Sequence, residues 1–150
     1  KLFGEESSEV ARILAQEERE GFLRKEKYLE FFAEIGEAKK ILFGKLNEIK
    51  VKGGRIAAYG ASARGTIFLN YCGIGLNLID FIVDKSSEKQ GRSTPRNAIP
   101  IFAPEEMRKE NPTHILMAAY TYFAEIMKEQ AWYGGTWIVP LPEYREIRKQ

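Results

Sequence analysis

Apolar residues recur with two different periods along the chain, and the change of period divides it into two regions. From Lys25 to Ile49 they alternate at spacings of four and three residues, which is typical of one face of a long helix. The stripe consists of Tyr28, Phe32, Ile35, Leu42, Leu46 and Ile49, with Lys39 as an interruption. A shorter helix is predicted before it, over Glu9–Glu20. The stripe is expected to pack on the domain that follows, and a surface between domains or between two copies of the chain is the alternative.

After a Lys- and Gly-rich break at Lys50–Gly54, short apolar runs replace the helical period. These runs predict strands at Ile56–Tyr59, Leu78–Val83, Ile99–Phe102, Ile115–Ala119 and Thr136–Val139, with helices between them and Pro140-Leu141-Pro142 ending the sheet. The alternation predicts an α/β fold: a Rossmann-like, doubly wound, mostly parallel sheet preceded by a two-helix N-terminal segment. We expect a helical segment over 1–50 and a Rossmann-like domain over 51–150.

The charge balance narrows the classes of partner. The 150 residues carry 23 basic and 21 acidic side chains mixed along the sequence, with a formal net charge of +2. No basic stripe with interleaved aromatic residues is present, so a dedicated nucleic-acid-binding protein is not expected. No apolar run approaches the length that spans a membrane, and no signal peptide is recognised, so no membrane association is expected.

The chain is poor in catalytic side chains. Cys72 is the single cysteine, which leaves no disulfide framework and no thiolate metal cluster and favours the reducing cytoplasm. His114 is the single histidine, and no carboxylate or nucleophile is obviously placed to work with it. We therefore expect a structural or surface role for His114, no catalytic residue and no metal site in this chain.

The turn between the first strand and the next helix is the strongest functional signal. Gly60, Ala61, Ser62, Ala63, Arg64 and Gly65 make up this turn. The first N–H groups of a helix lack internal partners and lie at the positive end of the dipole, so such a turn is a ready site for phosphate. The guanidinium of Arg64 can add a bidentate contact. The alternative is that the two glycines serve only tight packing of strand and helix.

The spacing of this turn is close to that of the dinucleotide-binding fingerprint, with Ser62 in place of the second glycine. Asp84, at the end of the second strand, stands where an acid would bind a ribose. Thr66-Ile67 follows where a P-loop requires Lys-Ser/Thr, so nucleoside triphosphate hydrolysis is not expected. Further binding candidates at the carboxyl ends of the strands are Lys85, Tyr120 and Tyr122, beside a cationic loop with Lys89, Gln90 and Arg92.

Two consecutive segments resemble a known family. Tyr59–Gly65, followed by Leu69-Asn70-Tyr71-Cys72-Gly73-Ile74-Gly75, is similar to the C-terminal domain of sugar C-methyltransferases. These are S-adenosylmethionine-dependent enzymes that act on nucleotide-linked deoxysugars. Weaker matches follow in the same order at Ile79–Asp84, Lys89–Arg92, Ile99–Ile101, Glu125–Met127 and Gly134–Glu143, so the resemblance covers most of the chain.

The chain also departs from the family pattern. The family usually has proline near Ser62, lysine near Arg64, and tryptophan and asparagine around Ala119-Tyr120-Thr121. The family's acidic, glycine-rich adenosylmethionine loop and its histidine-containing catalytic segment are absent from this sequence. The resemblance therefore implies the C-terminal part of a methyltransferase, with no cofactor bound here and S-adenosylmethionine expected on a missing N-terminal methyl-donor domain.

By this resemblance, the chain helps to hold a nucleotide diphosphate sugar while the other domain performs the chemistry. The turn residues Gly60–Gly65 are expected at the diphosphate, with Asn70 supporting the turn and Asp84, Lys85, Tyr120 and Tyr122 as candidates for ribose, base or sugar contacts. One alternative is a module that binds NAD or another coenzyme in a nucleotide-sugar-modifying enzyme. Another is a non-catalytic interaction scaffold, for which the Tyr28–Ile49 stripe would form a homodimer contact.

Overall fold

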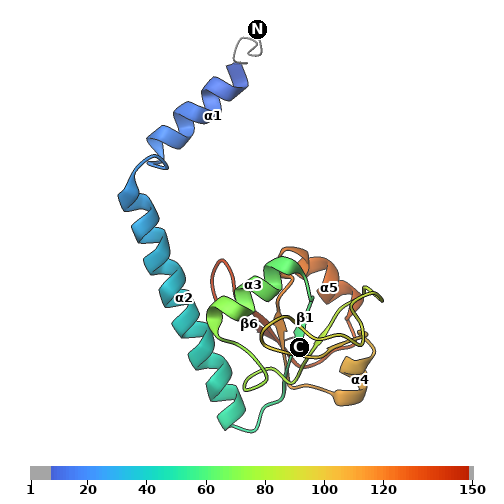
Figure 1. Cartoon of the computed structure of the whole chain (residues 1–150). Helices are drawn as coiled ribbons and strands as arrows, with labels where there is room; N and C mark the ends of the chain where they lie inside the picture. The colour runs from blue at the N-terminus through green and yellow to red at the C-terminus, as the bar shows by residue number, and fades with distance from the viewer. Residues whose placement is uncertain (1–7, 149–150) are drawn as a thin grey trace. The chain divides into compact units, whose positions relative to one another are not determined.

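The computed structural model describes residues 8–148, which begin with two helices, α1 (Ser8–Arg19) and α2 (Lys25–Val51) (Figure 1). Both agree with the helices predicted from the apolar period to within two residues. The contacts divide the chain into two compact units, Lys1–Glu37 and Ala38–Gln150. α2 therefore begins in the first unit and ends in the second. The functional boundary expected after residue 50 stays a prediction.

The second unit contains a six-stranded sheet in the order β3-β2-β1-β4-β5-β6. The strands are β1 (Ile56–Tyr59), β2 (Phe81–Val83), β3 (Ile101–Phe102), β4 (His114–Met117), β5 (Thr136–Val139) and β6 (Arg145–Arg148). The first five are parallel, and β6 pairs antiparallel with β5. This order, which reverses between β1 and β4, is that of the Rossmann fold. The predicted α/β, Rossmann-like fold with helices before it is confirmed.

Helices cover both faces of the sheet, and the strand residues alternate between two apolar clusters. On one face, Ile56 and Ala58 pack with Leu42 and Leu46 of α2 and with α3 (Ala63–Cys72). On the other face, Ala57 and Tyr59 pack toward α4 (Glu106–Glu110) and α5 (Phe123–Glu129). A short 3-10 helix, η1 (Tyr120–Tyr122), precedes α5. Because both faces are covered, the parallel strands read as continuous apolar runs.

The sheet does not end at Pro140-Leu141-Pro142, as the sequence had predicted. The chain turns after these prolines and adds β6, in which only Ile147 is even half-buried. An edge strand with one face in solvent needs no apolar run, so its polar sequence gave no strand signal. The predicted strand Leu78–Val83 is also shorter, because the ladder with β1 starts at Phe81 while the buried Leu78 and Ile79 precede it.

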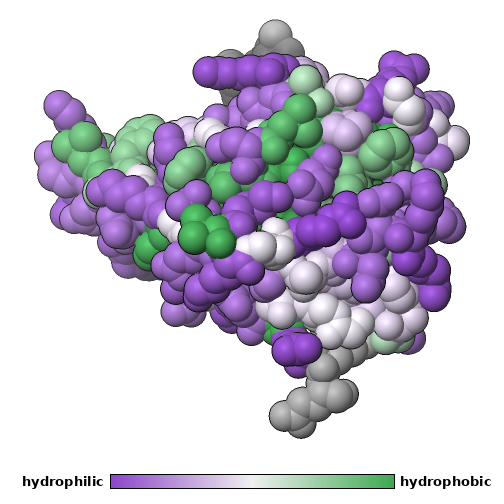
Figure 2. All heavy atoms as spheres, turned by 90° about the horizontal axis from the view of Figure 1, so that it is seen from below, coloured by the Kyte–Doolittle hydropathy of each residue, from purple (hydrophilic) through white to green (hydrophobic). Residues whose placement is uncertain are grey.

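The surface of the described chain is mixed. On the face shown in Figure 2, hydrophobic residues lie in small groups separated by hydrophilic ones. Within residues 8–148, no helix combines the length and the apolar character that crossing a bilayer requires. In open parallel sheets, ligands bind in the crevice outside the carboxyl ends of the strands.

Candidate functional site

The turn that leaves β1 depends on two glycines. Gly60 has φ +96°, and a Cβ atom placed on it would lie 2.4 Å from Cβ of Ala119, two residues after β4. A Cβ atom on Gly65 would lie 3.1 Å from the carbonyl oxygen of Ala118. The first glycine thus allows the tight turn and the second allows α3 to approach β4 closely. These are the roles of the first and third glycines in the dinucleotide-binding fingerprint.

Ser62 caps α3, although it stands where the fingerprint has its second glycine. Its Oγ accepts a hydrogen bond from the N–H of Gly65 at 3.0 Å, and its carbonyl oxygen accepts one from Thr66 at 2.9 Å. Within residues 8–148, the N–H groups of Ala63 and Arg64 then have no acceptor. Two free donors at the positive end of the helix dipole form an arrangement that attracts an anion.

Asp84 directly follows β2, and its carboxylate forms a hydrogen bond with the turn after β1. Its Oδ2 accepts hydrogen bonds from the N–H of Ala61 at 2.7 Å and from Nζ of Lys89 at 3.1 Å. Its Oδ1 accepts one from the N–H of Ser86 at 2.9 Å. Burial alone would raise the pKa of Asp84, but these hydrogen bonds outweigh it, so its pKa lies below the usual value. The buried carboxylate therefore stays ionised and joins the turn to the loop after β2.

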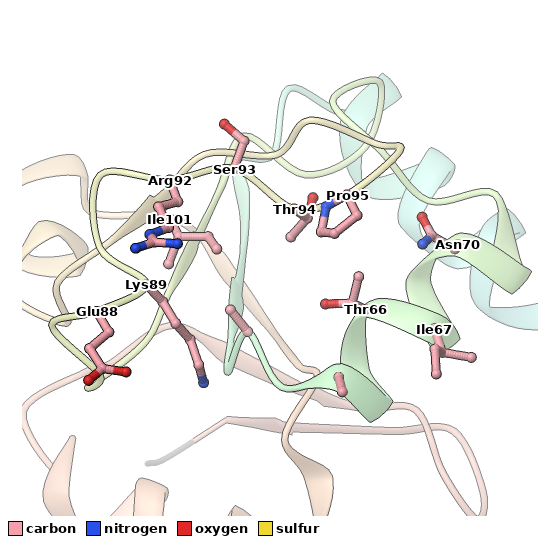
Figure 3. A pocket seen from close by; sticks show the side chains of 12 residues that line it. Thr66, Ile67, Asn70, Glu88, Lys89, Arg92, Ser93, Thr94, Pro95 and Ile101 are labelled. Atoms are coloured by element: carbon pink, nitrogen blue, oxygen red, sulfur yellow. The ribbon is translucent and has the colours of Figure 1, made fainter.

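A pocket of about 890 Å³ lies between α3 and that loop (Figure 3). We call it the α3 pocket. Its lining residues are Ala61, Ala63, Thr66, Ile67, Asn70, Glu88, Lys89, Arg92, Ser93, Thr94, Pro95 and Ile101. The small side chains of Ala61 and Ala63 leave the start of α3 open toward the pocket. Lys89 and Arg92 bring N–H donors from the opposite wall, beside the carboxylate of Glu88, and these donors suit the oxygens of a phosphate-bearing ligand.

The α3 wall of the pocket carries two polar side chains one helical turn apart, Thr66 and Asn70 (Figure 3). Oδ1 of Asn70 is buried and has no hydrogen-bond partner within residues 8–148. Leaving a buried acceptor unpaired costs about 1–3 kcal/mol. A ligand group that donates a hydrogen bond to this oxygen would remove that cost.

The remaining sequence candidates do not line the α3 pocket. Asp84, Lys85 and Tyr122 line a smaller cleft of about 220 Å³ with Glu125 and Ile126 of α5. There Lys85 forms ion pairs with Glu129 and Glu125, and the hydrogen bond with Glu129 raises the pKa of Lys85.

Tyr120 and Arg64 are in neither hollow. Tyr120 is half-buried against the α4–α5 cluster, and the exposed Arg64 belongs neither to the α3 pocket nor to the smaller cleft. The structure thus separates the candidates into two places. Ala61, Ala63 and Asn70 share the pocket with the cationic loop, whereas Lys85 and Tyr122 lie toward α5.

Sequence reasoning missed most of the pocket's outer wall. Glu88 and Ser93–Pro95 belong to an irregular loop whose path is set by contacts distant in sequence. For example, Nδ2 of Asn97 donates to the carbonyl oxygen of Ile74 at 2.7 Å. The sequence offered one weak indication that Thr66 lines the pocket: it lies one turn before Asn70 on the same face of the helix.

His114 and Cys72 lie away from the α3 pocket. His114 is the first residue of β4 and lies at the amino ends of the parallel strands, opposite to the carboxyl ends where Gly60 lies, and burial lowers its pKa. Oγ1 of Thr113 lies 2.8 Å from Nδ1 of His114 and 2.9 Å from the carbonyl oxygen of Arg55, so His114 is tied to the start of the strands rather than to the pocket. Cys72 is buried in the core, and burial raises its pKa to about 11. Within residues 8–148, no group of three metal-ligating side chains is arranged to hold a metal ion.

Comparison with known proteins finds two matches for this amino-acid sequence. A family model described as the C-methyltransferase C-terminal domain matches residues 3–142. The C-methyltransferase NovU of Streptomyces niveus is 34% identical over 141 residues, which cover 92% of this chain and 34% of that protein. The chain thus spans about one third of the length of the curated relative that it matches.

Proposed function

The chain belongs to the family of C-methyltransferase C-terminal domains, and from this premise we propose that it holds a nucleotide diphosphate sugar for methyl transfer. The observation that carries the proposal is the start of α3. There, the free N–H groups of Ala63 and Arg64 lie at the positive end of a helix, beside a pocket with Lys89 and Arg92. This combination offers both kinds of donor that bind a diphosphate.

In this proposal the diphosphate lies at the start of α3, and Lys89 contacts it from the loop. The pocket is large enough for a substituent of the size of a nucleoside or a sugar, and Ile67, Pro95 and Ile101 supply apolar surface. Thr66 and Asn70 would orient the substituent by hydrogen bonds. This chain's residues bind and orient. S-adenosylmethionine, which would supply the methyl group, and the base that removes the proton from the sugar carbon would lie outside this chain.

Binding of NAD or a related coenzyme is a second candidate, supported by the Rossmann strand order and by the roles of Gly60 and Gly65. In that case Asp84 would bind the ribose. Its carboxylate, however, already accepts hydrogen bonds from Ala61, Ser86 and Lys89, so little of its capacity remains. This use of Asp84 favours the nucleotide-sugar proposal.

The test is a calorimetric titration of the chain with thymidine and uridine diphosphate sugars, NAD and S-adenosylmethionine. We expect binding of a diphosphate sugar, weakened by about 1.5–3 kcal/mol in Lys89→Ala through loss of a charge-assisted contact. Lys109→Ala is the matched control, because this lysine pairs with Glu106 on α4, outside the pocket. Binding of NAD alone would support the coenzyme-binding candidate, and equal affinities of Lys89→Ala and the control would remove Lys89 from the site.

A further inference from the structure

The residues 8–37, here called the arm, cannot form a core of their own. None of them is buried. Between 22 and 32, six large apolar side chains are 42–80% exposed, and we call them the arm patch: Phe22, Leu23, Tyr28, Leu29, Phe31 and Phe32. Apolar surface gathered in so short a segment marks an interaction site more often than scattered exposure does.

The size of the arm patch is that of a protein–protein contact. Phe22, Tyr28, Phe31 and Phe32 are each about half exposed. Since an aromatic side chain buries about 150–250 Å², covering these four would remove on the order of 400 Å² from water. A standard interface buries about 800 Å² per partner. The aliphatic members of the patch and a rim of charged side chains can supply the remainder.

The charges around the patch are arranged to complement themselves. Arg24, Lys25 and Lys27 lie within its N-terminal half, between Leu23 and Tyr28, with one acid, Glu26, among them. Glu30 and Glu34 lie within and beyond it on the C-terminal side, and all of these side chains are exposed. If two such segments run antiparallel about a two-fold axis, the basic end of each faces the acidic end of the other. A parallel arrangement would place like charges together.

We propose that the arm patch is an isologous dimer surface, on which the N-terminal half of α2 (Lys25–Val51) pairs antiparallel with the same segment of a second copy. Tyr28, Leu29 and Phe32 form the apolar centre of the dimer. Lys27 of each copy faces Glu34 of the other copy. The inference goes beyond nucleotide-sugar binding and does not depend on it, because no residue of the arm lines the α3 pocket.

The first experiment is sedimentation equilibrium of the whole chain from micromolar to millimolar concentration. We expect a reversible dimer whose dissociation constant rises at least about 100-fold in Phe32→Glu, because each dimer loses two central contacts. Val51→Glu is the matched control: it introduces the same charge at an exposed apolar residue of α2 outside the patch. It should leave the constant unchanged, and circular dichroism should show both variants to be folded.

Charge exchange tests the antiparallel arrangement. Lys27→Glu and Glu34→Lys should each weaken the dimer by about tenfold, since each replaces two attractions by two repulsions. The double variant should restore the original constant. A monomer at every concentration, an assembly that grows beyond two copies, a dimer insensitive to Phe32→Glu, or failure of the double variant to recover would each overturn the proposal.

Discussion

Each residue of the turn after β1 has a distinct physical task. Gly60 supplies a positive φ where Ala119 leaves no room for a side chain, and Gly65 lets α3 pack on Ala118. Ser62 caps the helix, and Asp84 ties the turn to the neighbouring strand. Because these tasks differ, substitutions in the same turn should separate stability from binding.

Gly60→Ala should destabilise the chain by about 2–5 kcal/mol, because the new Cβ meets Ala119 and the backbone keeps a left-handed φ. Urea unfolding measures the change. Gly44→Ala in α2 is the control: a Cβ there meets nothing within 4 Å, so alanine should stabilise the helix by about 0.5–1 kcal/mol. Equal stabilities of the two variants would contradict this account of Gly60.

Asp84→Asn should lower the free energy of unfolding at pH 7 by about 1–3 kcal/mol, since the amide cannot accept from all three donors. The pKa of Asp84 is lower folded than unfolded, where it is about 3.9. The ionised Asp84 therefore contributes its full stabilisation at any pH above its unfolded-state pKa. That stabilisation is lost as the pH falls through its folded-state pKa. Urea unfolding at pH 7 and near pH 2 should show that the loss of stability in Asp84→Asn becomes smaller in acid. The control is Glu88→Gln, which changes an exposed carboxylate nearby and should leave the free energy of unfolding at pH 7 unchanged.

At the scale of elements, α3 links the fold to the proposed ligand. Its N-terminus is capped by Ser62, and its C-terminus ends at Gly73 in the left-handed conformation. Both ends follow rules that the sequence displays, since serine is a common N-cap and glycine a common stop. The free donors at Ala63 and Arg64 exist because the cap satisfies only part of the first turn.

Ser62→Ala should cost about 0.5–2 kcal/mol of stability through loss of the cap, while Ser62→Asp should keep the cap. The aspartate would nevertheless place a negative charge where the diphosphate is proposed to lie. Ser62→Asp should therefore unfold like the unmodified chain and bind the diphosphate sugar more weakly. Denaturation and calorimetry on the same samples distinguish the two effects. Unchanged affinity would place the diphosphate elsewhere.

The sequence predicted some elements of the fold more accurately than others, and the differences have physical reasons. β1 and β5 were predicted to their exact limits, because both are short apolar runs buried on two faces. β6 was missed because an edge strand needs no such run. In the candidate site, local rules identified the turn and its glycines, but the outer wall at Ser93–Pro95 depends on distant contacts that no local pattern encodes.

At the scale of the whole molecule, α2 belongs partly to the folded unit that contains the sheet. Leu42 and Leu46 are 2% and 0% exposed and pack in the core with β1 and α3. The apolar stripe along α2 is thus partly core packing, as one of the two sequence interpretations had it. The segment before Ala38 contributes no buried residue among those described.

A chain that begins at Ala38 should therefore keep its free energy of unfolding within about 1 kcal/mol. A chain that begins at Arg55 loses Leu42 and Leu46, and each fully buried leucine contributes about 1.5–3 kcal/mol. It should be less stable by more than about 3 kcal/mol. Thermal and urea unfolding of the two shortened chains compare the boundaries. If both were equally stable, α2 would lie outside the cooperative unit.

The hydrogen bond between Lys89 and Asp84 places a counter-ion for the ammonium group beside the α3 pocket. Together with Glu88 and Arg92, these side chains sum to zero formal charge, so the pocket exerts little long-range attraction on an anion. An arriving diphosphate would compete with Asp84 for the ammonium group and exchange one partner for another. The association rate should then depend only weakly on ionic strength, and selectivity would come from the short-range fit of phosphate oxygens to the N–H groups of α3.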